Sequence, residues 1–519
     1  MRSCGGPDRG GPSPVSTRLK SLAWLISLAF LVALAFGQPA FAAGFGESYR
    51  WHGPYTRSTQ NSSQYREFTG PRALFRRPGG PGGPYSLQGA SRLGERGDWR
   101  DFGNRGWRRP YGGFRNPGFR NARNGIFRPG FFMPPVDERR FVTNEVVLDM
   151  PSGMTPQTLN ALAQRYHLTR IGSETFGLTG HTLYRWRVED SRPVGDVIRD
   201  LQDEGDISGA QPNFTFTLQD QVRSVEPREG DPAQYAVGKL HLSEAHRLAT
   251  GDHVLVAVID SAIDTAQPEL QGVVAASFDA VGGDAAPHPH GTAMAGAIAA
   301  HGRLIGVAPR VRLLAVRAFG DGQDGAQATT FNIVRGLDWA VAHGARVVNM
   351  SFAGPADPVL QDALAKARQK GVVLVAAAGN AGPKSPPLYP AADPNVIAVT
   401  ATDANDRLFP QANRGSFVAV AAPGVDILVP APNAGVQLTS GTSVAAAQVS
   451  GIAALLVERD RLLTPDQARS ILTSTARHLG PAPRDNDFGA GLADAWQAVK
   501  MVESRSAERL SAGMPPPAR

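Results

Sequence analysis

The sequence contains a single cysteine, Cys4, among 519 residues. A disulfide framework, an iron–sulfur cluster, a zinc ribbon and a thiol enzyme are therefore excluded, because each needs cysteines that the chain lacks. Hydrophobic residues make up 42% of the chain and charged residues 19%, so the chain can bury a sizeable core and is neither wholly disordered nor fibrous. Its length corresponds to about three domains of average size.

A hydrophobic run long enough to be an ordinary membrane span is also missing near the N-terminus. The uncharged run at 22–36 has 15 residues, whereas a membrane-spanning helix needs about 20. Arg18 and Lys20 precede this run and Ala40-Phe41-Ala42 follows it, so residues 1–42 are predicted to be a secretory signal peptide cleaved after Ala42. We expect a secreted or periplasmic protein, and a membrane-anchored one only if the signal stays uncleaved.

The segment 43–135 has few aliphatic residues and little negative charge. Positions 44–135 hold 16 Arg, no Lys and 5 acidic residues, together with 18 Gly, 10 Pro and 17 aromatic residues. This composition cannot offset its chain entropy by burial and predicts disorder. Arginine and aromatic residues together resemble nucleic-acid-binding tails. A solvated spacer that contacts envelope polyanions suits an exported chain better, so no specific nucleic acid is expected as a partner.

Residues 136–222 are predicted to form a small α+β domain without a catalytic cluster. The order strand, helix, two strands, helix, strand is that of ferredoxin-like units. The predicted elements include a strand at 146–148, a helix from Pro156, a strand at 182–188, a helix from Pro193 and a strand at 214–218.

Residues 231–500 alternate continuous apolar runs with helical segments. Apolar runs buried on both faces indicate a mainly parallel sheet covered by helices, a doubly wound α/β architecture. The predicted strands are 254–259, 311–316, 346–350, 372–378, 396–400 and 417–421, and the predicted helices include 292–300, 332–343, 358–370 and 444–457. A linker at 223–230 is expected before this domain, and a flexible tail at 501–519 after it.

Four polar residues lie where sites occur in such sheets, at strand ends and helix starts. Asp260 follows the first strand, His290 begins a helix, Asn380 closes a strand and Ser443 heads the helix that contains 444–457. A serine hydroxyl needs an adjacent base to act as a nucleophile, imidazole suits that task, and a carboxylate fixes its tautomer. An amide can stabilise an oxyanion.

Each of these residues also has a purely structural explanation, since aspartate and serine often cap helices. Asp264 is the alternative to Asp260, and His288 is the alternative to His290. We interpret Asp264 as a loop or cap residue because it lies four residues past the strand. We interpret His288 as a loop residue because only His290 is followed by Gly-Thr.

The four motifs together, in the order Asp, His, Asn, Ser, resemble those of the subtilisin-like serine proteases. They are Asp260-Ser-Ala-Ile-Asp, His290-Gly-Thr, Ala-Gly-Asn380 and Gly-Thr-Ser443, within residues 231–500. The resemblance implies a triad of Asp260, His290 and Ser443, with Asn380 as the oxyanion donor. It implies further that residues 136–222 are an inhibitory propeptide and that the substrate-binding residues are Ser351, Phe352, Ala353 and Gly354.

The resemblance also sets the expected function, a secreted endopeptidase made as a self-processing zymogen and cut between Gln219 and Gly230. Its partners would be protein or peptide substrates and its own propeptide. The chemistry needs no cofactor. Many members of the family bind calcium, so the resemblance leaves room for a structural calcium ion, although the sequence has no EF-hand-type loop. Phe352 weakly indicates an apolar residue at the P1 position, the residue before the cleaved bond.

Several positions depart from the family pattern without removing a proton-transfer group. They are Ala262 in place of glycine, Gln267 in place of a frequent histidine, and Ala447-Gln448 in place of Pro-His. The alternative function is therefore an exported polyanion- or envelope-binding protein that acts through 44–135 and carries an inactive protease-like domain.

Overall fold

The computed structural model describes residues 130–224, 234–284, 286–322, 325–481 and 483–511. The predicted signal peptide and nearly all of the Arg-rich segment lie outside these ranges. Within them, no helix combines the length and apolar character needed to cross a membrane.

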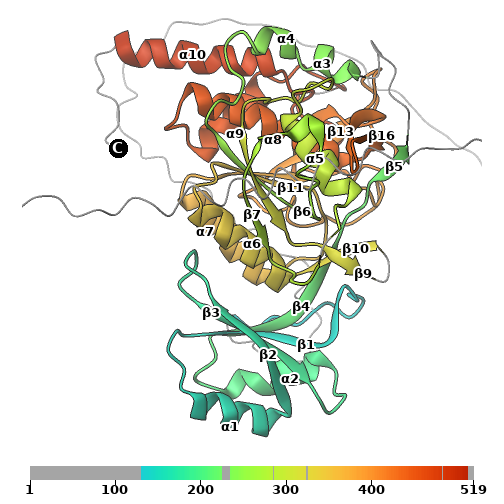
Figure 1. The fold of residues 1–519 in the computed structure, drawn as a ribbon. Helices are drawn as coiled ribbons and strands as arrows, with labels where there is room; N and C mark the ends of the chain where they lie inside the picture. Colours follow the sequence, from blue (N-terminus) through green and yellow to red (C-terminus); the bar gives the residue numbers. More distant parts are fainter. Residues whose placement is uncertain (1–129, 225–233, 285, 323–324, 482, 512–519) are drawn as a thin grey trace, which may run out of the picture. The chain divides into compact units, whose positions relative to one another are not determined.

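The small domain, residues 130–217, has the predicted ferredoxin-like order of elements (Figure 1). Its antiparallel sheet has the strand order β2-β3-β1-β4. The Thr155 side chain caps the first helix, and Pro156 is at its first position, as the sequence predicts. The elements are β1 (Phe141–Met150), α1 (Pro156–Tyr166), β2 (Leu168–Thr175), β3 (Thr182–Val188), α2 (Val194–Asp200) and β4 (Gly209–Thr217).

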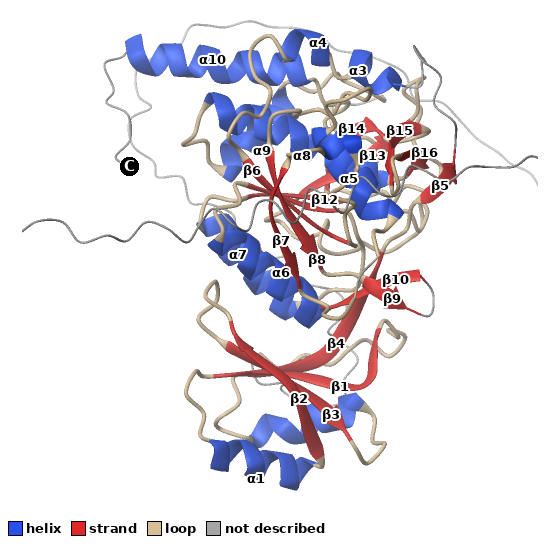
Figure 2. Cartoon of the chain, in the orientation of Figure 1, coloured by secondary structure: helices blue, strands red, loops and turns tan. Residues whose placement is uncertain are grey.

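The large domain, residues 234–511, contains a seven-stranded parallel sheet in the order β14-β13-β12-β11-β6-β8-β7 (Figure 2). The fold class predicted from the apolar runs is confirmed. The strands are β6 (Leu255–Asp260), β7 (Val274–Asp279), β8 (Arg312–Arg317), β11 (Val347–Met350), β12 (Val373–Ala377), β13 (Ile397–Thr402) and β14 (Val418–Pro423).

Helices cover both faces of this sheet, and alternate residues of β6 supply the two cores. Val256 and Val258 pack in the core that includes α5 and α8, whereas Ala257 and Ile259 pack in the core that includes α6 and α7. The principal helices are α5 (Pro289–Ala299), α6 (Thr330–Ala342), α7 (Pro358–Gln369), α8 (Thr442–Arg459), α9 (Pro465–Ser474) and α10 (Ala495–Ser511), beside short helices α3 (Tyr235–Lys239) and α4 (Leu242–Ala245).

The two domains share a sheet, because β4 pairs with β10 (Gly325–Thr329) of the large domain, which in turn pairs with β9 (Gly320–Gly322). A separate three-stranded sheet joins β15 (Ile427–Ala431), β16 (Gly435–Ser440) and β5 (Gln221–Ser224). Residues 218–224, which we call the connecting segment, lead from β4 through β5.

Two predictions of disorder were wrong at their edges. Residues 130–135 were expected to be disordered, but Phe131 is buried and bridges Ala210, and the Phe132 ring lies 5.8 Å from that of Phe214. The two aromatic residues are ordered because they pack against β4, although their own segment has few aliphatic residues. The expected tail from 501 is helical to Ser511, since Val499 and Val502 pack in the large domain's core.

Candidate active site

The four predicted polar residues meet at one edge of the parallel sheet. Asp260 is the last residue of β6, Asn380 follows β12, and His290 and Ser443 lie in the first turns of α5 and α8. Strand carboxyl ends and helix N-termini face the same edge in this architecture. Asp260, His290 and Ser443 are all buried, at 0%, 4% and 2% exposure.

Asp260 holds His290 through a short hydrogen bond. His290 Nδ1 lies 2.7 Å from Asp260 Oδ1, which also accepts hydrogen bonds from the Ser261 amide and hydroxyl. Nδ1 therefore carries a proton, and Nε2 is the atom left to exchange protons with a reactant. Gly291 permits the close approach of α5, because a Cβ there would lie 2.4 Å from the carbonyl oxygen of Ser261.

The two alternative residues have structural roles. Asp264 Oδ1 accepts from the amide of Ala266 and its Oδ2 accepts from the amide of Asn433. His288 is the N-cap of α5, and its Nδ1 accepts from the amide of His290 at 3.2 Å. These contacts agree with the loop and cap roles expected from the sequence.

Asn380 has a fixed amide orientation. Its Oδ1 accepts from the Thr442 amide at 3.0 Å and from the Thr442 hydroxyl at 2.8 Å, so Nδ2 is the end that faces the site. Nδ2 donates to the carbonyl oxygen of Gln219 at 3.2 Å and to Asp220 Oδ1 at 3.1 Å. An amide held in this way can stabilise a developing oxyanion.

The chain between the two domains passes through the site as an added strand. Thr217 exchanges backbone hydrogen bonds of 3.0 and 3.2 Å with Ala353, and on its other side it pairs with Gln327 of β10. Further along, Gln221 pairs with Ser440 of β16. Backbone pairing on both sides of a reacting centre is how an extended peptide is recognised at a sheet edge.

The segment Ser351–Gly354, predicted to bind substrate, contacts this strand. Ala353 supplies the backbone pairing, while the Phe352 ring packs edge-on against Phe216 at 5.9 Å. A Cβ on Gly354 would lie 2.2 Å from the Phe216 ring, so only glycine leaves room there. Phe352 thus contacts Phe216, the side chain three residues before Gln219.

Ser443 and His290 are not hydrogen-bonded to each other in this state. The Ser443 hydroxyl donates to the Ser351 carbonyl at 3.4 Å, and the Ser351 hydroxyl donates to the Ser443 carbonyl at 3.0 Å. Among the described residues, His290 Nε2 has no hydrogen-bond partner. The two residues therefore lie in the same site without a hydrogen bond through which a proton could pass between them.

Asp220 is the one acidic group in the site that sequence reasoning missed. Its side chain is 1% exposed, and its Oδ2 lies 3.6 Å from His290 Nε2. Burial raises the pKa of the Asp220 carboxyl, and His290, Ser443 and Asn380 oppose this only in part. An acidic residue in a linker between domains has no pattern that would have singled it out.

His290 is strongly shifted by its acidic neighbours. Burial alone would lower its pKa, but Asp260, through charge and hydrogen bond, and Asp220, through charge, outweigh burial. The result raises the pKa of His290 to about 9. Both carboxylates therefore favour the protonated form of the imidazole in this state.

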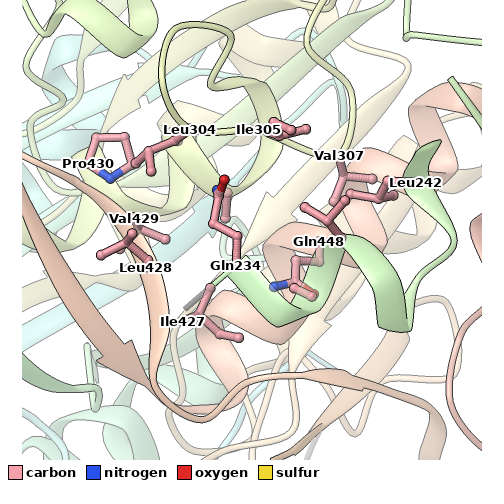
Figure 3. A pocket seen from close by; sticks show the side chains of 14 residues that line it. Gln234, Leu242, Leu304, Ile305, Val307, Ile427, Leu428, Val429, Pro430 and Gln448 are labelled. Carbon is pink, nitrogen blue, oxygen red and sulfur yellow. The ribbon is translucent and has the colours of Figure 1, made fainter. Parts of the chain in front are cut away.

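Three departures from the family pattern, at 262, 267 and 448, have structural surroundings that the structure shows. The carbonyl of Ala262 accepts from the His288 amide, so the turn after Asp260 is formed. Gln267 caps a one-turn helix and donates to the carbonyls of Ala431 and Gly435. Gln448 lines a cavity of about 20 Å³ (Figure 3), which is room for about one water molecule.

A metal centre has no obvious ligand set in the described ranges. No group of three or more His, Cys, Asp or Glu side chains there is arranged to hold an ion. The structural calcium ion for which the sequence left room therefore has no group of these side chains as candidate ligands among the described residues.

Comparison with known families supports the assignment of the fold. The model of the Subtilase family matches residues 251–491, which include all four polar site residues. The small domain lies outside the match. Fervidolysin from Fervidobacterium pennivorans superimposes with a TM-score of 0.61 at 24% identity, covering 72% of this chain and 63% of its own. At that identity the likeness concerns the fold.

Three curated proteins illustrate the sequence relationship. Thermitase from Thermoactinomyces vulgaris is 34% identical over 275 residues, which are 51% of this chain and 96% of thermitase. Subtilisin E from Bacillus subtilis (strain 168) is 36% identical, over 51% of this chain and 71% of its own. The minor extracellular protease Epr of the same organism is 32% identical over 60% of this chain and 52% of Epr. The chain therefore spans about half the length of Epr.

Proposed function

Because the chain belongs to the subtilase family of serine endopeptidases, we propose that it cleaves peptide bonds with Ser443 as the nucleophile. Asp260 and His290 complete the triad in this proposal, and Asn380 is the oxyanion donor. The polyanion-binding alternative with an inactive domain is not favoured by these relatives.

In this mechanism the Ser443 hydroxyl turns from the Ser351 carbonyl, to which it donates in the precursor, toward His290 Nε2. His290 Nε2 accepts the Ser443 hydroxyl proton as Oγ attacks the substrate carbonyl carbon, and Asp260 stabilises the imidazolium that forms. Asn380 Nδ2 stabilises the oxyanion. His290 then protonates the leaving amine, the C–N bond breaks, and water hydrolyses the acyl-enzyme by the same proton path.

One observation carries the proposal, namely that the chain's own backbone crosses the site as a substrate would. The Gln219 carbonyl oxygen lies 3.2 Å from Asn380 Nδ2, and Thr217 is paired with Ala353 two residues earlier. This arrangement supports a zymogen in which residues 136–222 inhibit the large domain until they are cut off in cis. The processing region expected from the sequence, Gln219 to Gly230, begins at the carbonyl that faces Asn380.

The same arrangement supports a substrate preference. Phe216, three residues before Gln219, packs against Phe352 beside Gly354. Protein and peptide substrates with a large apolar residue at this position, P4, are therefore expected to be cleaved fastest.

Export is proposed from the N-terminal sequence together with a relative. Residues 1–42 have the features of a secretory signal, and Epr is by its name an extracellular protease. A secreted or periplasmic enzyme follows, with membrane attachment only if the signal remains.

The function is tested with the Ser443→Ala variant. This change removes the nucleophile but leaves the fold intact, so cleavage of casein and release of the small domain should both be abolished. Circular dichroism checks that the variant is folded. Continued casein cleavage by the folded variant would refute the assignment.

A further inference from the structure

We propose that Gln219–Asp220 is the first bond the precursor cuts and that the Asp220 carboxylate delays this cut by engaging the catalytic groups. The inference deepens the proposed function and rests on it. Two observations support it, namely the register of the connecting segment in the site and the contacts of the buried Asp220 side chain.

The register identifies the bond. Backbone pairing with Ala353 fixes Thr217, and pairing with Ser440 fixes Gln221. Between these points the only backbone oxygen that Asn380 Nδ2 contacts is that of Gln219, at 3.2 Å. An oxyanion donor marks the carbonyl under attack. The residue after it, Asp220, thus belongs to the leaving side.

The Asp220 side chain turns back into the site. Its Oδ1 accepts a hydrogen bond of 3.1 Å from Asn380 Nδ2, the donor that the Gln219 oxyanion would need. Its Oδ2 lies 3.6 Å from His290 Nε2 and has no hydrogen-bond partner in the described ranges. Gly441 makes this position accessible, because a Cβ there would lie 2.1 Å from Asp220 Oδ1.

This carboxylate opposes the reaction in two ways. It shares the oxyanion donor, and in its ionised form it places a negative charge beside the atom of His290 that must be unprotonated to accept the Ser443 proton. The charged and titratable groups around His290 are Asp260 on β6, Asp220 on the connecting segment and His288 at the N-cap of α5. Only the two carboxylates favour the imidazolium.

The chemistry of the cut explains why the delay ends by itself. Ser443 Oγ bonds to the Gln219 carbonyl carbon, its proton passes through His290 to the Asp220 nitrogen, and the C–N bond breaks. Asp220 then becomes the first residue of the large domain's chain and is free to leave the site. Water hydrolyses the acyl-enzyme, which frees the Ser443 hydroxyl and leaves a new carboxylate on Gln219, while Asp220 is no longer joined to the bound segment.

The pH dependence follows with a definite sign. Because the two carboxylates raise the pKa of His290 to about 9, the neutral imidazole is the minor form at pH 7. Self-cleavage of the precursor should therefore rise with pH and level off above about 9. Neutralising Asp220 lowers the pKa of His290, so the rate at pH 7 should increase about tenfold for each unit of that fall.

The experiment compares full-length precursors that are refolded and sampled between pH 6 and 10. Mass spectrometry measures the rate of self-cleavage and the new N-terminus. Asp220→Asn should cleave about tenfold faster at pH 7, with its profile moved to lower pH. Asp206→Asn, which removes the same charge at an exposed site of the small domain, should match the wild type.

Two results would overturn the inference while leaving the protease intact. One is an Asp220→Asn precursor with the wild-type rate and pH profile, and the other is a first cut away from Gln219–Asp220. If no precursor cleaves itself at any pH, the proposed function fails instead.

A second measurement does not depend on cleavage. In the Ser443→Ala precursor, which keeps the segment bound, NMR of the labelled imidazole should show His290 titrating near pH 9. Adding Asp220→Asn to this uncleaved precursor should lower that midpoint, and an unchanged midpoint would contradict the inference.

Discussion

The strands β1 and β6 are both buried on two faces, but they obtain this burial differently. On β6, Val258 faces one set of the large domain's own helices and Ile259 faces the other set. On β1, Val146 packs on the small domain's own helices, whereas Val147 packs in the core that contains α6 and α7 of the large domain. The large domain therefore completes its own core, and the small domain does not.

This difference fits a permanent domain joined to a removable one. All the proposed chemical groups lie in the large domain, whereas the small domain contributes a strand, a buried glutamine and half of a shared core. Changes in the large domain should affect both precursor and mature protein. Changes on the facing surface of the small domain should affect the precursor alone.

The largest effect should come from the oxyanion donor. Asn380→Ala removes Nδ2 and should lower turnover of peptide substrates by about 10²–10³-fold, and self-cleavage by a similar factor. Steady-state kinetics and precursor processing measure the two. If Asn380→Ala abolished self-cleavage but left the turnover of added peptides normal, the two reactions would not depend on the same group in the large domain.

A smaller effect separates the two cores. Ile259→Ala should destabilise precursor and mature protein alike, by about 2–5 kcal/mol, because both forms keep this core. Leu183→Ala, in the shared core, should destabilise only the precursor. Urea unfolding of the Ser443→Ala precursor and of the inhibitor-blocked mature protein tests this. A Leu183→Ala precursor that unfolds at the same urea concentration as the parent precursor would contradict the comparison.

The smallest effect concerns one buried contact between the domains. Gln211 Nε2 donates to Asp357 Oδ1 at 2.9 Å, and its Oε1 accepts from the Val359 amide. Gln211→Ala should weaken the hold of the cut small domain by about 1–3 kcal/mol. The lag between self-cleavage and casein activity should then shorten. Gln157→Ala, exposed on α1, is the control and should leave the lag unchanged.

The sequence predicts most of the sheet because fully buried parallel strands are continuous apolar runs. The six strands predicted in this way are all present. β7 was missed because it is an edge strand whose exposed and partly buried residues alternate. β10 was missed because it gains its pairing from β4 of another domain, which no local pattern encodes.

The site residues, too, could be predicted from the sequence only where a local motif marks them. Motifs that begin helices or follow strands carry Asp260, His290, Asn380 and Ser443, so these residues could be named from the sequence. The place of Asp220 depends instead on the register of a strand laid between two others, which is set by tertiary pairing. Whether Phe352 faces P1 or P4 depends on that register too.

The proposed activity depends on Ser443 acting as a nucleophile that His290 activates. Fluorophosphonate labelling of the processed protein, followed by peptide mapping, measures this reactivity. We expect one adduct, on Ser443, and no adduct in a His290→Ala variant. A folded, processed protein that forms no adduct, or forms it at another serine, would refute this role of Ser443.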